Sequence, residues 1–345
     1  MKQTLLYDHY YDLAFKNNSP VSVMIELLTS CNLRCEHCYI PDYYDNGFSI
    51  EQIFKLLGQL REMGIQNVSF TGGEIFVRKD IFEIIEYARK HYMRVFLLSN
   101  GTLLTESIAK RLKELHISEF STTLFSMDHS IHDSITRKKG SWEALMNGLS
   151  MLKKYDIITK IKTPIMKKNV DGIQNIKDFC EKNDFEFLAS PTIFNKNDGS
   201  SEPQNFCISD DKMISVIKFV DSLSNRNYLH NRNVSCAALF YSFSIDCNGN
   251  VYPCNSFMCK VGNVFETHPR DVWNNSEILQ EIKSISDDKL GVCKNCEYKP
   301  ECYRCPALVY MNNKDFYSCD EYSKKLSKIR MSCLLYTSDA ADEAR

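Results

Sequence analysis

The sequence has no excess of charge of either sign. It carries 42 Lys and Arg residues against 44 Asp and Glu residues, which gives a formal net charge of -2. Proteins that bind nucleic acids or anionic membranes electrostatically carry clustered positive charge. The composition therefore gives no reason to expect a nucleic acid or a membrane as a partner.

Long apolar runs are also absent. No segment reaches the ~18 consecutive apolar residues that a membrane-spanning helix needs. The N-terminus lacks the basic start, apolar run and small-residue cleavage site of a signal peptide. We therefore expect a cytoplasmic protein. Because disulfides are rare in that reducing compartment, the 15 cysteines of the chain favour metal ligation over disulfide formation.

Three of these cysteines lie together directly after the apolar run 21–28. Cys31, Cys35 and Cys38 have the spacing C-x3-C-x2-C, which can converge on one metal centre only in a loop. Thiolates are the ligands of iron-sulfur clusters and of zinc. No fourth Cys or His follows nearby except His37, which stands between two ligands, and three ligands with one open position are typical of a catalytic metal site. Spacing alone leaves a zinc site completed by a distant residue as the alternative.

Strand and helix patterns alternate after this loop. Apolar, β-branched segments predict strands at 21–28, 68–71, 94–99, 119–126, 157–163 and 185–190, and helical periodicity predicts helices at 49–63, 81–91, 105–115, 142–155, 173–183 and 211–223. Six such units predict parallel strands with right-handed crossovers. They are too few for a closed eight-fold barrel. We therefore expect an α/β fold with a partial (βα)6 TIM-like barrel, whose functional residues follow the strands.

The composition divides the chain into four parts. Residues 1–20 are expected to form a lead-in with one short helix, too short for a separate peptide-binding domain, and residues 21–228 the barrel. Residues 229–332 are expected to form a small cysteine-rich domain, since 345 residues exceed what one core usually supports. Residues 333–345 look like translated sequencing-adapter DNA, so we interpret them as an artefact that replaces the natural C-terminus and do not count Cys333.

The C-terminal part has cysteines that recur without a helical or strand period. They are Cys236, Cys247, Cys254, Cys259, Cys293, Cys296, Cys302, Cys305 and Cys319. Pairs with C-x2-C spacing suit both iron-sulfur clusters and zinc, so zinc knuckles or ribbons are the alternative here. Cys180 and Cys207, which lie outside these groups, are expected to be buried as small hydrophobic residues.

The cysteine loop and the strand-helix units that follow it resemble the radical S-adenosylmethionine (SAM) superfamily. This resemblance implies a 4Fe-4S cluster held by Cys31, Cys35 and Cys38, with SAM chelated at the open iron. Reductive cleavage of SAM would yield a 5'-deoxyadenosyl radical that takes a hydrogen atom from the substrate, so the three cysteines count as catalytic. The cofactors supply this chemistry, and the protein positions them.

Loops after other strands resemble the SAM-binding segments of this family. The segment Thr71-Gly72-Gly73-Glu74 matches its Gly-Gly-Glu segment, in which the glycines allow close backbone approach and Glu74 would accept from the SAM ammonium. The other implied SAM contacts are Tyr39 and Ile40 beside the adenine, Ser99 and Asn100 along the nucleoside, and Ser126 and Arg137 at the ribose or the carboxylate. Plain turns, and a surface position for Arg137, are the alternatives.

The C-terminal part resembles the SPASM domain, which in many radical SAM enzymes holds two auxiliary 4Fe-4S clusters. By position, Cys236, Cys254 and Cys305 would bind the first cluster. The second cluster would be bound by Cys293, Cys296, Cys302 and Cys319. The fourth ligand of the first cluster is open: that iron is unligated by protein, or is bound by His230, Cys247 or Cys259.

The resemblance implies an oxidoreductase. Our first hypothesis is oxidative cross-linking of a ribosomally made peptide or protein, with an electron donor such as flavodoxin or ferredoxin. Because the cysteine loop leaves no room for an N-terminal leader-binding domain, leader recognition would need a separate protein or the SPASM surface. The alternatives are a cofactor or small-molecule biosynthetic enzyme, a non-catalytic iron-sulfur or zinc protein, and a sulfatase-maturing enzyme. The last is disfavoured, because Asn255 stands where those enzymes have a basic Asp.

Overall fold

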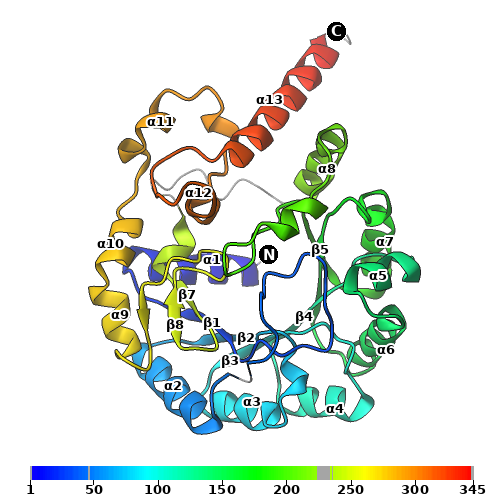
Figure 1. Cartoon of the computed structure of the whole chain (residues 1–345), viewed down its shortest axis with the longest axis vertical. Helices are drawn as coiled ribbons and strands as arrows, with labels where there is room; N and C mark the ends of the chain where they lie inside the picture. Colours follow the sequence, from blue (N-terminus) through cyan, green and yellow to red (C-terminus); the bar gives the residue numbers. More distant parts are fainter. Residues whose placement is uncertain (1, 46, 224–233, 235, 343–345) are drawn as a thin grey trace.

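The computed structural model describes residues 2–45, 47–223, 234 and 236–342 (Figure 1). The strands are β1 (Ser22–Glu26), β2 (Asn67–Thr71), β3 (Arg94–Leu98), β4 (Glu119–Thr123), β5 (Thr159–Pro164), β6 (Glu186–Ser190), β7 (Ser242–Ile245), β8 (Asn250–Tyr252) and β9 (Gly262–Asn263). The helices are α1 (Lys2–Lys16), α2 (Ile50–Met63), α3 (Ile81–Lys90), α4 (Glu106–Glu114), α5 (His129–Thr136), α6 (Ser141–Lys154), α7 (Ile173–Asn183), α8 (Asp210–Ser222), α9 (Pro269–Asn275), α10 (Glu277–Lys283), α11 (Gly291–Lys294), α12 (Pro306–Asn313) and α13 (Glu321–Asp342).

The strands form one nine-stranded sheet in the order β6-β5-β4-β3-β2-β1-β7-β8-β9. Strands β1 to β6 are parallel to their neighbours, as the alternating pattern predicts. Helices α2, α3, α4, α6 and α7 lie around the outside of the curved sheet (Figure 1). The α/β fold with a parallel core sheet is therefore confirmed, and the C-terminal ends of its strands meet at one edge.

The helix α2 shows how local sequence sets the element boundaries. The Ser49 side chain accepts from the Gln52 backbone while the Gln52 side chain accepts from the Ser49 backbone, a capping box that starts the helix. Gly64 ends it with φ 104°, a left-handed conformation that glycine adopts without strain. Between these ends the helix buries Ile53, Leu56, Leu57 and Leu60 against the sheet.

The C-terminal part does not stand apart from the core sheet. Strand β7 pairs in parallel with β1, and β8 and β9 follow as antiparallel strands. The sequence pattern did not predict these additions, because short strands beyond residue 240 carry little periodic signal. The predicted domain boundary between residues 228 and 229 lies outside the described residues and stays a prediction.

Three further elements differ from expectation. The N-terminal segment forms a helix of 15 residues, longer than the short helix predicted. Helix α5 was not predicted; it begins at the N-cap Asp128, whose carboxylate accepts from the backbone N–H groups of Ser130 and Ile131. Helix α13 continues through Asp342 and so includes most of residues 333–345. The interpretation of that tail as an artefact stays a prediction.

The N-terminal segment packs on the C-terminal part of the chain. The rings of Tyr11 and Tyr241 lie 5.0 Å apart. At the end of the segment, the Asn18 carbonyl accepts from the Trp273 indole at 2.9 Å, and its side chain accepts from Lys283, also at 2.9 Å. The N-terminal segment and the C-terminal part therefore stabilise each other.

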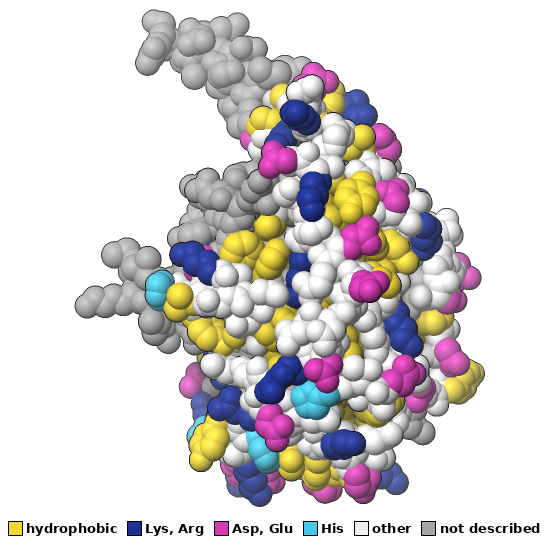
Figure 2. Space-filling view, turned by 90° about the vertical axis from the view of Figure 1, so that its left-hand side faces the viewer, with side chains coloured by type: hydrophobic (Ala, Val, Ile, Leu, Met, Phe, Trp, Pro, Cys, Tyr) yellow, Lys and Arg dark blue, Asp and Glu magenta, His cyan; other side chains and the backbone are white. Residues whose placement is uncertain are grey.

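The charge distribution on the surface and the character of the helices agree with two expectations from the sequence. On the face shown in Figure 2, basic and acidic side chains alternate rather than gather by sign. Within the described part of the chain, no helix is long and apolar enough to cross a membrane.

Candidate active site

The loop with Cys31, Cys35 and Cys38 follows β1 at the C-terminal edge of the sheet. It is held by the end of α5: the Arg34 N–H donates to the Thr136 carbonyl at 3.2 Å, and the Glu36 N–H donates to the Ile135 carbonyl at 3.0 Å. Helix α5, which sequence periodicity missed, therefore supports the cysteine loop.

The glycines after β2 lie directly on the start of this loop. The Gly73 N–H donates to the Leu28 carbonyl, and the Glu74 N–H donates to the Ser30 carbonyl, both at 2.9 Å. A Cβ on Gly73 would come within 2.3 Å of the carbonyl oxygens of Thr29 and Ser30. No side chain fits there, which explains the need for glycine. The two backbone hydrogen bonds join the two predicted SAM-binding segments.

Glu74 is fully buried, and its carboxylate joins the loops after β2 and β3. Its oxygens accept from the Ser99 hydroxyl at 2.8 and 3.0 Å, from the Asn100 N–H at 2.8 Å and from the Phe76 N–H at 3.0 Å. Burial raises the pKa of Glu74, and these donors oppose the rise. The structure thus gives Glu74 a bridging role within the protein, while its contact with the SAM ammonium stays a prediction.

Asn100 connects this network to the cysteines. Its side-chain amide donates to Cys31 Sγ at 3.8 Å and to Asn32 Oδ1 at 2.8 Å. The Asn32 amide in turn donates to the Thr102 hydroxyl at 2.9 Å. Asn100 therefore lies at the cysteine loop, while its predicted contact with the SAM nucleoside stays a prediction.

The three thiols of the loop influence one another. Burial raises the pKa of Cys35, and the neighbouring Cys38 and Cys31 raise it further, while Arg137 lowers it. Burial also raises the pKa of Cys31 and of Cys38. Without a cation, these side chains are therefore neutral thiols; a bound metal centre would stabilise the thiolates.

The remaining predicted SAM contacts lie at the same edge of the sheet. Arg137 ends α5 with φ 56°, and its charge acts on Cys35. Ser126 is buried after β4, where its hydroxyl accepts from the Asp128 N–H at 3.0 Å. Tyr39 hydrogen-bonds Thr71, and the next residue, Ile40, is buried.

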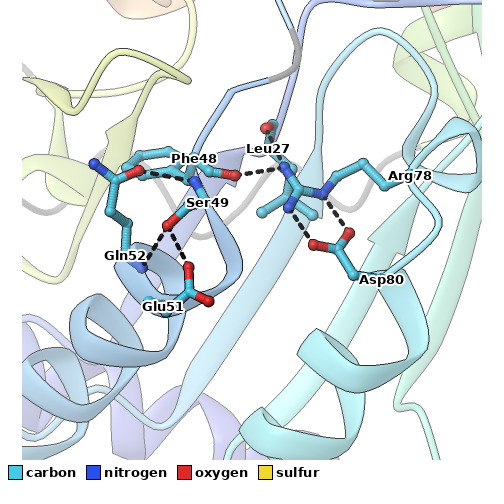
Figure 3. A network of polar contacts seen from close by, with 7 residues as sticks. All are labelled: Leu27, Phe48, Ser49, Glu51, Gln52, Arg78 and Asp80. Atoms are coloured by element: carbon cyan, nitrogen blue, oxygen red, sulfur yellow. Dashed lines mark hydrogen bonds and ion pairs between the residues drawn. The ribbon is translucent and has the colours of Figure 1, made fainter.

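Arg78 fixes the segments that flank the site (Figure 3). Its guanidinium pairs with both oxygens of Asp80, at 2.9 and 2.7 Å. The same group donates to the Phe48 carbonyl at 2.9 Å and to the Leu27 carbonyl, just after β1, at 3.3 Å. One side chain therefore connects the end of β1, the start of α2 and the start of α3.

The cysteines of the C-terminal part form two groups. In one group, burial raises the pKa of Cys254, and the neighbouring Cys305 and Cys236 raise it further. In the other, Cys293 and Cys302 raise the pKa of Cys319 after burial and Glu321, while the Cys296 N–H donates to the Cys293 carbonyl at 3.3 Å. The structure thus brings together the two sets that the resemblance implies, while their role as ligands stays a prediction.

Candidates for the fourth ligand of the first set lie in different places. Cys259 is buried in the apolar cluster that also includes Cys236, Cys254 and Cys305. The Cys247 thiol instead donates to Asp45 at 3.6 Å. His230 lies outside the described residues. Elsewhere, Cys180 is fully buried in the core as expected, and Cys207 is only half-buried.

A cavity of about 320 Å³ lies between the cysteine loop and the C-terminal part. The cysteine loop contributes His37 and Tyr39, the segment after β6 contributes residues 192–199, and the C-terminal part contributes Asn255, Ser256, Met258, Tyr310, Met311 and Lys314. Both halves of the chain therefore line the space beside the three thiols. We name this space the main cavity.

A smaller cavity, of about 20 Å³, adjoins the main cavity and shares Tyr39, Asn197, Asn255 and Met258 with it. Glu26, at the end of β1, lines this smaller space. Burial raises the pKa of Glu26 to about 8, and Asp246 and Asp45 add to the rise. At neutral pH the carboxyl group is therefore mostly protonated in the unliganded protein.

Comparison with known proteins identifies the family. Residues 25–180 match the family model of the radical SAM superfamily, and residues 236–297 match that of SPASM, an iron-sulfur cluster-binding domain. The chain belongs to the radical SAM superfamily.

Radical SAM relatives with different roles resemble this chain. An AdoMet-dependent heme synthase of Nitratidesulfovibrio vulgaris is 25% identical over 342 residues, covering 87% of this chain and 91% of the relative. The subtilosin biosynthesis protein AlbA of Bacillus subtilis is 27% identical over 311 residues, covering 86% of this chain and 69% of the relative. The crystal structure of Streptococcus suis SuiB bound to its precursor peptide SuiA shares the fold, with a TM-score of 0.69 at 17% identity, covering 92% of this chain and 80% of SuiB.

Radical SAM proteins with SPASM domains use SAM and 4Fe-4S clusters, and the residues present fit these cofactors. The Cys31 loop offers three mutually close thiols, none of which is in a disulfide. Among the described residues, no three acidic, His or Cys side chains crowd close enough to hold a single metal ion. In a 4Fe-4S cluster each cysteine binds a different iron, so its ligands need not meet at one point.

Sequence reasoning missed several residues that line the two cavities. The segment 192–199 and the C-terminal half of the main cavity carry no recognisable motif, because tertiary packing alone brings them to the cysteine loop. Glu26 did leave a signal: it is the only charged residue in the apolar run 21–28. An acidic residue inside a buried strand indicates a functional or paired position.

Proposed function

We propose that this radical SAM protein carries out the oxidative maturation of a ribosomally made peptide. When bound and reduced, the cluster and SAM supply a 5'-deoxyadenosyl radical, which takes one hydrogen atom from the substrate. The chain's own residues would bind the peptide, hold the reacting carbon near SAM and exclude water. We expect this to take place in the cytoplasm with a flavodoxin or ferredoxin as reductant, and with a separate protein or the SPASM surface binding the leader.

The main cavity is the observation that supports this proposal. Its volume of about 320 Å³ lies near the lower end of the ~300–1,000 Å³ range of small-molecule sites. That space suits one or two amino-acid side chains of a peptide whose remainder stays outside. It extends to Asn255, directly after Cys254, so a bound side chain would lie between the Cys31 loop and the first C-terminal cysteine set.

The two cysteine groups of the C-terminal part support an oxidative reaction. Forming a cross-link removes two hydrogens from the peptide: one leaves as an atom to the deoxyadenosyl radical, the other as a proton and an electron. An auxiliary cluster is a chemical sink for that electron. Asn255 cannot accept the proton, which keeps a sulfatase-maturing reaction disfavoured.

A second candidate function is modification of a tetrapyrrole. The heme synthase relatives, which match 85–88% of this chain, favour it. Lys196 and Lys314 at the main cavity would suit the carboxylates of such a substrate. Against it, a tetrapyrrole is larger than one or two side chains, so the cavity would have to widen.

Mass spectrometry of two parallel reactions separates these functions. The reconstituted protein, SAM and dithionite would be incubated either with a peptide encoded beside its gene or with iron coproporphyrin. Loss of two hydrogens from the peptide, dependent on Cys35, supports peptide maturation. Decarboxylation of the porphyrin, with the peptide unchanged, would refute it in favour of the second candidate.

A further inference from the structure

The smaller cavity offers room for a single polar group. A cavity needs roughly 10–15 Å³ to hold one water molecule, and this one measures about 20 Å³. Its walls include Glu26, Thr71, Asp246, Tyr252 and Asn255. Most of these side chains present oxygen atoms, so the cavity suits a group that donates hydrogen bonds.

One carboxyl oxygen of Glu26 lacks a partner at this position. The residue is 9% exposed, and its Oε1 atom is buried without a hydrogen bond from any described residue. Buried polar atoms are nearly always paired, so an orphaned carboxyl oxygen on a residue that lines a cavity indicates a bound group.

The surrounding charge indicates the sign of that group. The charged residues that act most strongly on Glu26 within the described chain are Asp246 and Asp45, both acidic. Asp246 is itself held in place: its carboxylate accepts from Asn250 at 2.9 Å and from the Tyr252 hydroxyl at 3.1 Å. A cation would relieve the repulsion among these carboxyl groups, whereas a carboxylate would add to it.

Size narrows the choice of cation. A guanidinium has four heavy atoms, while an ammonium head has one and donates up to three hydrogen bonds. Tyr39 and Met258 border both cavities, so an alkyl stem that reaches from the main cavity would pass along apolar surface. These features match a primary amine on a flexible chain.

We propose that the smaller cavity binds a primary ammonium group of the substrate, a lysine side chain or the amino end of a peptide, with Glu26 as its ion partner. The inference rests on the proposed function in one respect, namely that the adjoining main cavity receives the substrate. The inference restricts the proposed substrates to peptides that carry a primary amine in reach of this cavity.

Calorimetric titration with n-butylammonium, which mimics a lysine side chain, tests this inference on the full-length reconstituted protein in saturating SAM. 1-Butanol has a similar chain without the charge, and tetramethylammonium has the charge on a head too large for the cavity. We expect n-butylammonium to bind at least ten-fold more tightly than either. Glu26→Gln should lose that preference, whereas Glu83→Gln, an exposed change on α3, should keep it.

Three results would overturn the inference. Equal binding of n-butylammonium and 1-butanol to the unmodified protein would mean that the cavity holds only water, and this comparison needs no variant. Unchanged selectivity in Glu26→Gln would remove Glu26 as the partner. Binding that occurs only without SAM would assign the cavity to the cofactor's own ammonium.

Deoxyadenosine formation in the same samples, measured after dithionite is added as the reductant, separates this inference from the proposed function. If deoxyadenosine forms without amine binding, the inference alone fails. If the amine binds without deoxyadenosine formation, the proposed function fails instead.

Discussion

Glu26 makes the stability of the protein depend on pH in a direction opposite to that of most carboxyl groups. Its pKa is raised from 4.5 to about 8, mainly by burial and then by Asp246 and Asp45. A carboxyl group with a raised pKa favours the folded state below its unfolded pKa, and that contribution is lost as the pH rises toward the folded value. We therefore expect Glu26 to destabilise the protein progressively between pH 4.5 and 8.

The size of this effect follows from the two pKa values. At about 1.4 kcal/mol per pKa unit, raising the pH from 5.5 to 8.5 should cost the unliganded protein roughly 3 kcal/mol through Glu26. With an unfolding entropy of ~2.1 cal/mol/K per residue, that corresponds to a melting temperature about 4 °C lower. The neutral variant Glu26→Gln should lack this component.

Anaerobic thermal unfolding of the wild type and of Glu26→Gln across pH 5.5–8.5 measures the difference. In the difference between the two proteins, the contributions of the other titrating groups cancel. The exceptions are groups whose charge interacts with that of Glu26, namely Asp45, Asp246, Cys38, Tyr39, Cys247 and Tyr252. The variant should gain stability over the wild type as the pH rises. A difference that stays constant with pH, or that favours the wild type at high pH, would refute the assignment of a buried, unpaired carboxyl.

Further predictions concern the network around the site and the cysteines. Arg78→Lys keeps the charge but loses the paired contact with Asp80, so we expect roughly 1.5–3 kcal/mol lower stability in urea unfolding; an unchanged midpoint would contradict this. Glu74→Gln places an amide N–H₂ against a buried donor, which should cost about 1–3 kcal/mol and weaken SAM binding in calorimetry; full SAM affinity would argue against the bridging role. Cys293→Ser should remove about four irons per chain, whereas Cys180→Ala should leave the iron content unchanged, and equal iron loss in both variants would contradict the ligand assignment.

The sequence predicts the core of the fold well because its segments are strongly periodic. The capping box at Ser49 and the glycine at 64 mark the ends of α2 as the structure has them. Helix α5 was missed because it is short and begins with polar residues at 129 and 130, so that only the Asp128 cap marks it. The pairing of β7 with β1 depends on contacts more than 200 residues apart in the chain, which local patterns do not encode.

The candidate site was predictable where the spacing of residues in the sequence indicates a chemical role, such as metal ligation by cysteines. The spacing of Cys31, Cys35 and Cys38 predicts one metal centre, whereas the two C-terminal cysteine sets follow only from the resemblance to the SPASM domain, and the structure brings each set together. Glu74 was recognised as a site residue, but its saturation by Ser99, Asn100 and Phe76 could be learned only from the folded chain. The two cavities are formed by residues from both halves of the chain, which explains why no sequence motif predicts them.

Anaerobic reconstitution with iron and sulfide, followed by SAM and dithionite, tests whether this chain cleaves SAM at a 4Fe-4S cluster. We expect about twelve irons per chain by the thiolate count and formation of 5'-deoxyadenosine, which Cys35→Ala abolishes. Bound zinc, with no cleavage of SAM, would refute radical SAM chemistry and make this chain a structural metal protein.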